Sequence, residues 1–302
     1  MLHHASQTRY RKRRNLFARL LTDRRSTRSL GGNIVLVLTL GLMASIFLFP
    51  VIFMVNNAFK PLIELLKFPP DIFVKNPTFE NFQDLGELFA NSLVPFSRYL
   101  FNTIFIVVAG TAGQIILASM AAYPLAKYDF PGRNLIFNLI VMSLMFSAAV
   151  TAVPTYIIVS KLKLTDTYLS IILPAFASTL GLYLMINFME QVPSSLIESA
   201  AIDGANEINT LFSIVMPAVK PAWITLFILS FQNMWGVTGS TFIYDESLKT
   251  LSYALGQIAT SGIARQGVMA AVSLIMFIIP TIIFIFMQSN VIETMTTSGM
   301  KE

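Results

Sequence analysis

The residues best suited to specific chemistry lie in a polar stretch between two apolar ones. Residues 190–207 hold four acids and no base, namely Glu190, Glu198, Asp203 and Glu207. Acidic groups on one surface orient and select a partner of opposite charge. The neighbouring Ala200, Ala201 and Ala205 are small, so they permit close approach. The chemistry indicated here is docking into a basic and apolar cleft.

Local patterns predict a short helix in this stretch. Pro193 followed by two serines marks a helix start, and Ser195 with Glu198 fits a capping box. Gly204 is placed to end the helix, because glycine tolerates the left-handed conformation of a helix C-terminus. A second helix start is expected near Asn206 or Asn209. Considered alone, these residues fit a docking element and a solvated connector equally well.

A second group of residues is suited to binding hydroxyl groups. Amide side chains match the hydrogen-bonding pattern of a sugar, and aromatic rings cover its apolar face. The same side chains also serve as packing or interhelical hydrogen-bonding groups, and that alternative stays open for each. The candidates for a substrate path are Gln114, Tyr156, Tyr183, Asn187, Gln232, Asn233 and Trp235.

Several other chemistries find no support in the sequence. The chain has no cysteine, and its two histidines, His3 and His4, lie in a polar tail, so no metal site is expected. The string Gly262–Gly267 lacks the Lys-Ser/Thr that grips phosphate in a P-loop. No H-E-x-x-H or G-x-S-x-G motif occurs. The chain is therefore expected not to be an enzyme and to hold no cofactor of its own.

The composition predicts a membrane protein that positions these residues on helices. Of the 302 residues 55% are hydrophobic and 12% are charged. Six runs without Asp, Glu, Lys or Arg each exceed the roughly 20 residues that cross a bilayer as a helix. They are residues 29–59, 99–126, 134–160, 167–189, 221–244 and 266–292. Lipid-exposed backbone must bond internally, so the expected fold is all-α with six transmembrane helices. The polar stretch forms a cytoplasmic loop, which the resemblance described below implies is a coupling-helix loop.

The expected helices lie at about 33–55, 99–124, 135–160, 168–189, 217–236 and 267–288. The segment 57–98 is rich in proline and should contain only short helices. The chain then divides into a basic tail (1–32), a first helix with an external loop (33–98), a core of five helices with a coupling loop at 190–217 (99–290), and a C-terminal tail (291–302). A row of small residues in the second helix indicates close helix packing: Ala109, Gly110, Ala112, Gly113, Ala118, Ala121 and Ala122.

The basic tail sets the expected orientation. Residues 9–28 contain nine Lys or Arg and one acid, Asp23. Beside a transmembrane helix such a cluster indicates a cytoplasmic anchor on anionic lipid rather than a nucleic-acid site. Six crossings then place both the N-terminus and the C-terminus in the cytoplasm. No ionisable residue falls in the middle of a predicted helix, which disfavours ion-coupled transport.

The polar stretch resembles the "EAA" loop of permease subunits of ATP-binding-cassette (ABC) importers. That pattern is E-A-A-x3-G-x9-I-x-L-P, and its matches here are Glu198, Ala200, Gly204, Ile214 and Pro217. Ser199 replaces the first Ala and Met216 replaces the Leu. The run Asp203-Gly204-Ala205, with Phe212 and Pro221, is similar to the carbohydrate branch and its maltose-type permeases. The C-terminal residues from Gln288 to Lys301 resemble the tail of that branch.

The resemblance implies a subunit that forms half of a sugar channel in a bacterial inner membrane. Its implied partners are a second, non-identical permease, two ATPases that supply ATP and magnesium chemistry, an external solute-binding protein and the lipid bilayer. The residues implied to dock on an ATPase are Glu198, Ser199, Ala200, Ala201, Asp203, Gly204 and Ala205. Two alternatives stay open: an importer permease for a non-sugar solute, and a self-sufficient six-helix channel or carrier.

Overall fold

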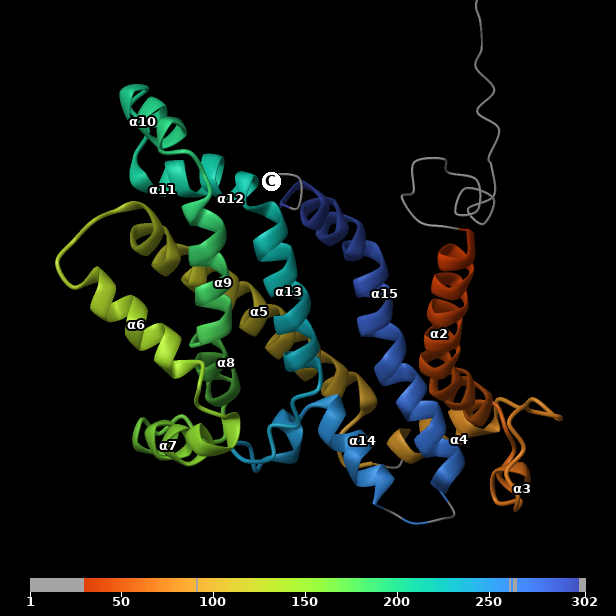
Figure 1. Cartoon of the computed structure of the whole chain (residues 1–302). Helices are drawn as coiled ribbons and strands as arrows, with labels where there is room; N and C mark the ends of the chain where they lie inside the picture. The colour runs from red at the N-terminus through yellow and green to blue at the C-terminus, as the bar shows by residue number, and fades with distance from the viewer. Residues whose placement is uncertain (1–29, 91, 261, 263–264, 299–302) are drawn as a thin grey trace, which may run out of the picture. The chain divides into compact units, whose positions relative to one another are not determined.

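The computed structural model describes residues 30–90, 92–260, 262 and 265–298 (Figure 1). These described residues form helices and turns and contain no strand. The chain divides into two units, residues 1–56 and residues 57–302, and each is described by itself. The predicted basic anchor at 9–28 and the two histidines lie outside the described residues.

The first unit contains one long apolar helix, α2 (Leu30–Ala58), whose last two residues belong to the second unit. Its segment Gly31–Ala58 is apolar enough to cross a membrane. Three polar side chains of this helix, those of Thr39, Ser45 and Asn56, bond to the backbone one turn earlier. Thr39 Oγ1 donates to Val35 O and Ser45 Oγ to Gly41 O, each at 2.8 Å. These bonds satisfy the hydroxyl groups without water, as a lipid-facing helix requires.

The second unit contains the remaining helices. They are α3 (Leu62–Leu65), α4 (Glu80–Ala90), α5 (Phe96–Lys127), α6 (Arg133–Ser143), α7 (Ala148–Lys161), α8 (Leu169–Phe176), α9 (Thr179–Glu190), α10 (Ser194–Ile202), α11 (Glu207–Thr210), the π-helix η1 (Leu211–Val215), α12 (Met216–Ala218), α13 (Lys220–Trp235), the 3-10 helix η2 (Glu246–Leu248), α14 (Leu251–Ala259) and α15 (Gln266–Ser298). Within this unit α10, α11 and α12 lie at one end, called here the loop end, and α7 and α14 lie at the opposite end (Figure 1).

Four stretches of the described residues are long and apolar enough to span a membrane. They are Gly31–Ala58, Phe96–Lys127, Leu169–Glu190 and Gln266–Gln288. Two further candidates are pairs of helices bent by 111° (Arg133–Ser143 with Ala148–Lys161) and by 84° (Glu207–Ala218 with Lys220–Trp235). The described chain therefore has four to six candidate spans, which agrees with a polytopic membrane protein.

The helix predicted at 135–160 is not continuous, because the chain turns sharply between Ser143 at the end of α6 and Ala148 at the start of α7. Turn bonds close the break, with Met145 N donating to Met142 O and Phe146 N to Ser143 O. Ser143 Oγ donates to Ile140 O at 2.7 Å and to Thr179 Oγ1 at 3.2 Å. The second of these bonds ties the end of α6 to the start of α9.

Helix α5 lies at the centre of the packing in the second unit. A Cβ added at Gly113 would collide with the ring of Phe176 on α8, and one added at Gly110 would lie 3.1 Å from the sulfur of Met234 on α13. The glycines therefore let α8 and α13 approach α5 closely. This result confirms the predicted packing role for the two glycines, whereas Ala112 and Ala121 of the same row are exposed.

The segment before α5 also follows its prediction, since α3 and α4 are short and separated by turns. Asn81 at the start of α4 is buried, and its Nδ2 donates to Ala58 O (2.9 Å) and Lys60 O (2.8 Å). Beyond it, Leu85 and Phe89 of α4 pack in one cluster with residues of α5, α14 and α15. This cluster fixes the far end of the unit.

Candidate functional site

The first candidate site is the short helix α10 and the turn that follows it. Gly204 has a φ of +80°, the left-handed conformation that favours glycine. Gly204 N donates to Ala201 O at 3.1 Å and Ala205 N to Ala200 O at 2.9 Å. This pair of bonds is a Schellman motif, which satisfies the last carbonyls of the helix. The predicted helix end at Gly204 is confirmed.

The start of α10 differs in detail from the prediction. The helix begins at Ser194, with Pro193 as its N-cap and no capping side chain. Ser195 lies inside the first turn, so the predicted capping box with Glu198 is wrong. Proline restricts the backbone enough to start the helix without a side-chain cap.

The surface of α10 combines exposed acids with exposed apolar groups. Glu198 and Asp203 are exposed, while Ile202 is 86% exposed and Leu196 46%. Ala200 alone among the residues of α10 is buried, at 5%. One side of the helix therefore packs on the chain, and the other presents acids around large apolar side chains. Of the other predicted docking residues, Ser199 and Ala201 are exposed and Ala205 is half-buried.

The start of the 190–217 loop is held by basic residues beyond its own sequence. Lys127, the last residue of α5, donates from Nζ to Glu190 O (3.2 Å) and Val192 O (2.5 Å). Arg133 pairs with the Glu190 carboxylate at 3.2 Å and donates to Leu125 O at 2.7 Å. Two of the last carbonyls near the end of α9 thus have a cationic partner.

The second half of the loop is anchored through Glu207. Its Oε2 accepts hydrogen bonds from the hydroxyl of Tyr123 (3.1 Å) and from that of Tyr128 (2.6 Å). Burial and then the bond to Glu207 raise the pKa of the Tyr128 hydroxyl above its usual 10.0. Asn206 caps the helix that follows, because its Oδ1 accepts from Asn209 N at 2.8 Å. The predicted second helix start near Asn206 is confirmed.

The four acids of the loop therefore divide into two pairs. Glu190 bonds to Arg133 at the start of α6 and Glu207 to Tyr123 and Tyr128, whereas Glu198 lies on α10 and Asp203 in the turn that follows it. The sequence indicated a continuous acidic docking surface. All four acids are exposed, and two of them also bond to residues of their own chain.

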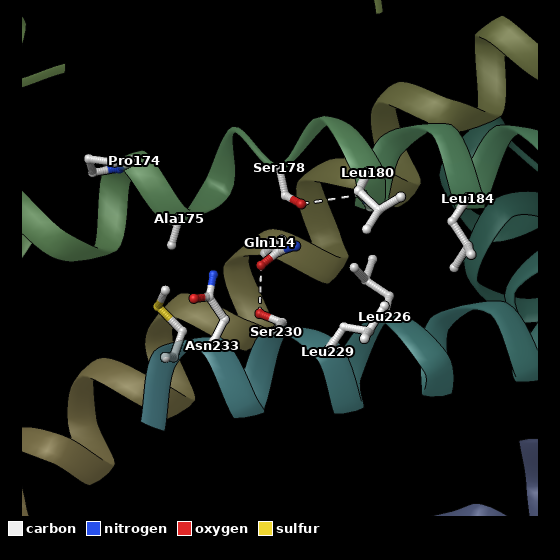
Figure 2. A pocket seen from close by; sticks show the side chains of 12 residues that line it. Gln114, Pro174, Ala175, Ser178, Leu180, Leu184, Leu226, Leu229, Ser230 and Asn233 are labelled. Atoms are coloured by element: carbon white, nitrogen blue, oxygen red, sulfur yellow. Dashed lines mark hydrogen bonds between the residues drawn. The ribbon is translucent and has the colours of Figure 1, made fainter. Parts of the chain in front are cut away.

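The second candidate site is a cavity of about 430 Å³ between α5, α8, α9 and α13 (Figure 2). It falls within the size range of small-molecule sites. Its lining is Gln114, Pro174, Ala175, Ser178, Leu180, Gly181, Leu184, Leu226, Leu229, Ser230, Asn233 and Met234. Figure 2 shows side chains of α8 and α9 facing those of α13, with Gln114 of α5 between them.

The polar groups of this cavity are uncharged and partly committed to one another. Ser230 Oγ donates to Gln114 Oε1 at 2.5 Å, which leaves the Gln114 amide nitrogen as a donor toward the cavity. Ser178 Oγ accepts from Gly181 N at 3.2 Å and keeps its own proton to donate. Asn233 adds an exposed amide with both donor and acceptor capacity. This arrangement suits a neutral ligand with several hydroxyl groups.

The structure brings together only some of the predicted substrate-path residues. Gln114 and Asn233 line the cavity. Trp235 is 5% exposed, and its Nε1 donates to Met276 O of α15 at 3.1 Å. The others do not line the cavity: Asn187 Nδ2 bonds to Tyr183 O at 2.7 Å, Tyr156 OH lies 3.0 Å from Tyr244 OH, and Gln232 is exposed.

Sequence reasoning missed Ser178 and Ser230. Ser178 follows Pro174 by four residues, and a serine there is a usual N-cap, so the break between α8 and α9 could have been found. Ser230 lies in a run of apolar residues, where a hydroxyl group equally fits a bond to its own helix.

Comparison with known proteins identifies the family. Residues 114–295, which include both candidate sites, match the model of the binding-protein-dependent transport system inner membrane component. The chain belongs to this family.

Relatives of this permease match over most of its length. Protein LplC of Bacillus subtilis (strain 168) is 31% identical over 281 residues, covering 88% of the permease and 93% of LplC. The arabinooligosaccharides transport system permease protein AraQ of the same strain is 27% identical over 270 residues, covering 89% and 95%. The resemblance to ABC importer permeases is confirmed. Permease subunits of this family are membrane proteins and are not ATPases.

A solved structure shows the same fold. The crystal structure of a bacterial ABC transporter involved in the import of the acidic polysaccharide alginate contains a chain that is 22% identical, with a TM-score of 0.74. The match covers 85% of the permease and 95% of that chain.

Proposed function

We propose that the permease forms half of the channel of an ABC importer for a sugar or oligosaccharide. The observation that best supports this proposal is the similarity to an arabinooligosaccharide permease over 89% of the chain. The cavity between α5 and α13 agrees with it, because its amides and hydroxyl groups match those of a neutral saccharide. A binding protein outside the membrane delivers the sugar, as the family description implies.

The driving force comes from other subunits. Helix α10 docks on one of two ATPases, which hold ATP and magnesium, and Glu198, Asp203 and Gly204 belong to the contact. Exposed acids around Ile202 and Leu196 fit a cleft with a basic rim and an apolar floor. A second, non-identical permease completes the channel. Six crossings, with both bent helix pairs counted, place the 190–217 loop and both termini in the cytoplasm.

The docking proposal is tested by purifying the tagged permease from its own membranes and identifying its partners by mass spectrometry. We expect a second permease and a P-loop ATPase. Glu198→Lys should remove the ATPase, because it reverses the charge of an exposed acid on α10. Glu87→Lys makes the same change at an exposed acid of α4, a helix outside the 190–217 loop, and should keep the ATPase. Sustained sugar flux in liposomes containing this chain alone would refute the proposal.

The substrate path is tested with two adjacent amides. Asn233 lines the cavity and Gln232 does not, although both are exposed. Asn233→Leu should raise the KM for uptake of an arabinooligosaccharide about 2- to 10-fold, the effect of losing one hydrogen bond to the ligand. Gln232→Leu should leave the KM unchanged. Equal effects of the two substitutions would contradict this assignment of the cavity.

A further inference from the structure

The loop end of α5 is tied to the 190–217 loop at two separate points. Lys127 holds the carbonyls at the beginning of the loop, and Tyr123 and Tyr128 hold Glu207 beyond α10. Helix α10 therefore lies between two attachments to the same helix. A displacement of α10 can reach α5 through these polar attachments, beside the apolar contacts of the loop with α5.

The attachment at Glu207 is the more directional of the two. One carboxylate oxygen accepts both tyrosine hydroxyl groups, and the two rings meet edge to face with centroids 5.8 Å apart. Tyr123 is 5% exposed, so its ring is fixed in the core. Hydrogen bonds to a carboxylate are short and directional. Apolar contacts of the same loop, such as those of Leu211 and Val215, have no preferred direction and permit sliding.

The same helix contributes a wall of the cavity. Gln114 lies nine residues before Tyr123 on α5, a distance of about 13.5 Å along the helix axis at 1.5 Å per residue. The side chain of Gln114 is fixed by Ser230 on α13. A movement imposed on Tyr123 is thus passed along a continuous helix to a residue of the cavity.

We infer that Glu207 is a positioning residue that transmits displacement of α10 to α5 and so changes access to the cavity. The inference rests on the proposed function, since it presupposes an ATPase that displaces α10. It assigns Glu207 a role distinct from docking, because its carboxylate is occupied by hydroxyl groups of its own chain. Glu198, Asp203 and Glu207 are all exposed, and Glu207 differs from the other two in its bonds to Tyr123 and Tyr128.

The absence of native cysteine in the sequence permits a direct test. Leu229→Cys places one thiol in the cavity wall at a position that is 44% exposed. In the purified complete assembly, the rate at which a charged maleimide labels this thiol is measured without nucleotide and after trapping with ATP and vanadate. The ratio of the two rates reports how far the ATPase cycle changes access to the cavity.

Three variants, each combined with Leu229→Cys, test the attachment at Glu207. Glu207→Ala should bring the trapped-to-free ratio close to one, while the ATPase stays bound. Tyr128→Phe removes a single hydroxyl group from a side chain that is 39% exposed, so it should fold normally and move the ratio only part of the way toward one. Asp129→Ala is the matched control: it removes an acid at the same end of the unit whose side chain is 98% exposed and whose ion pair, at 3.5 Å, is with Arg133 and not with the tyrosines, so the ratio should not change.

An unchanged ratio in both Glu207→Ala and Tyr128→Phe would overturn the inference. Loss of the ATPase from the Glu207→Ala assembly would also overturn it, because Glu207 would then be a docking residue. If no ATPase co-purifies with the unsubstituted permease, the proposed function itself fails, and the inference fails with it. Whether an ATPase co-purifies with the unsubstituted permease distinguishes failure of the proposed function from failure of the inference alone.

Discussion

The left-handed glycine that ends α10 gives the most quantitative prediction. A Cβ added at Gly204 would meet no atom within 4 Å, so substitution by alanine introduces no clash. The cost comes from the backbone alone, because φ is +80°. An L-residue in that conformation costs about 1–2 kcal/mol. Gly204→Ala should therefore weaken the turn by that amount and leave the rest of the fold unchanged.

Hydrogen exchange measures this local effect directly. The amide of Ala205 donates to Ala200 O and depends on the turn. A loss of about 1–2 kcal/mol corresponds to exchange about 5- to 30-fold faster in peptides covering residues 194–206. Gly204→Asn should give a smaller increase, because asparagine tolerates the left-handed region better than alanine.

A second left-handed glycine is the matched control. Gly132 has a φ of +95°, and a Cβ there also meets no atom within 4 Å. Gly132→Ala should accelerate exchange at the start of α6 by a similar factor and leave residues 194–206 unaffected. Only Gly204→Ala should lower the amount of ATPase that co-purifies. Unchanged exchange at 194–206 in Gly204→Ala would refute the argument from backbone conformation.

Two further predictions concern packing and pH. Gly113→Ala should lower the free energy of unfolding by about 1–3 kcal/mol, because its Cβ collides with Phe176. Gly86→Ala on α4, where a Cβ meets no atom within 4 Å, should be neutral or stabilise by up to about 1 kcal/mol. Thermal unfolding of the purified chain measures both effects. The raised pKa of Tyr128 means that the folded state keeps its proton longer than the unfolded chain, so this stabilisation is complete below pH 10 and is lost as pH rises through the folded pKa. Tyr128→Phe should remove that alkaline loss, measured as unfolding midpoints between about pH 9 and pH 11.

Features set by local chemistry could be predicted from the sequence. The charge-free run 99–126 lies within α5 (Phe96–Lys127), because a lipid-facing helix excludes ions along its whole length. Gly204 was recognised as a helix end since few other residues adopt its conformation. In each case the physical reason lies in neighbouring residues, and the sequence displays those residues side by side.

Features set by distant contacts could not be predicted. The break between α6 and α7 contains neither glycine nor proline, and it is tied to Thr179 of α9, 36 residues from Ser143. Glu207 and its tyrosines are 79 and 84 residues apart. The EAA-like pattern includes Glu198 and not Glu207, but nothing in the sequence indicates that Glu207 bonds to tyrosines at the end of α5. The different surroundings of the two acids appear only when α5 is placed beside the loop.

The role inferred for Glu207 requires that α5 move as a stiff rod, although glycine in a helix usually weakens it. Gly110 and Gly113 lie between the tyrosines and the far end of the helix. Both, however, are covered by side chains of neighbouring helices, Met234 and Phe176. Bending α5 at either glycine would have to displace these groups from a packed core, which resists changes in volume. The glycines that bring the helices together thus restrain α5 beyond Gln114. The stretch from Gln114 to Tyr123 contains neither glycine nor proline, so a push on Tyr123 is delivered near Gln114 rather than absorbed by a bend.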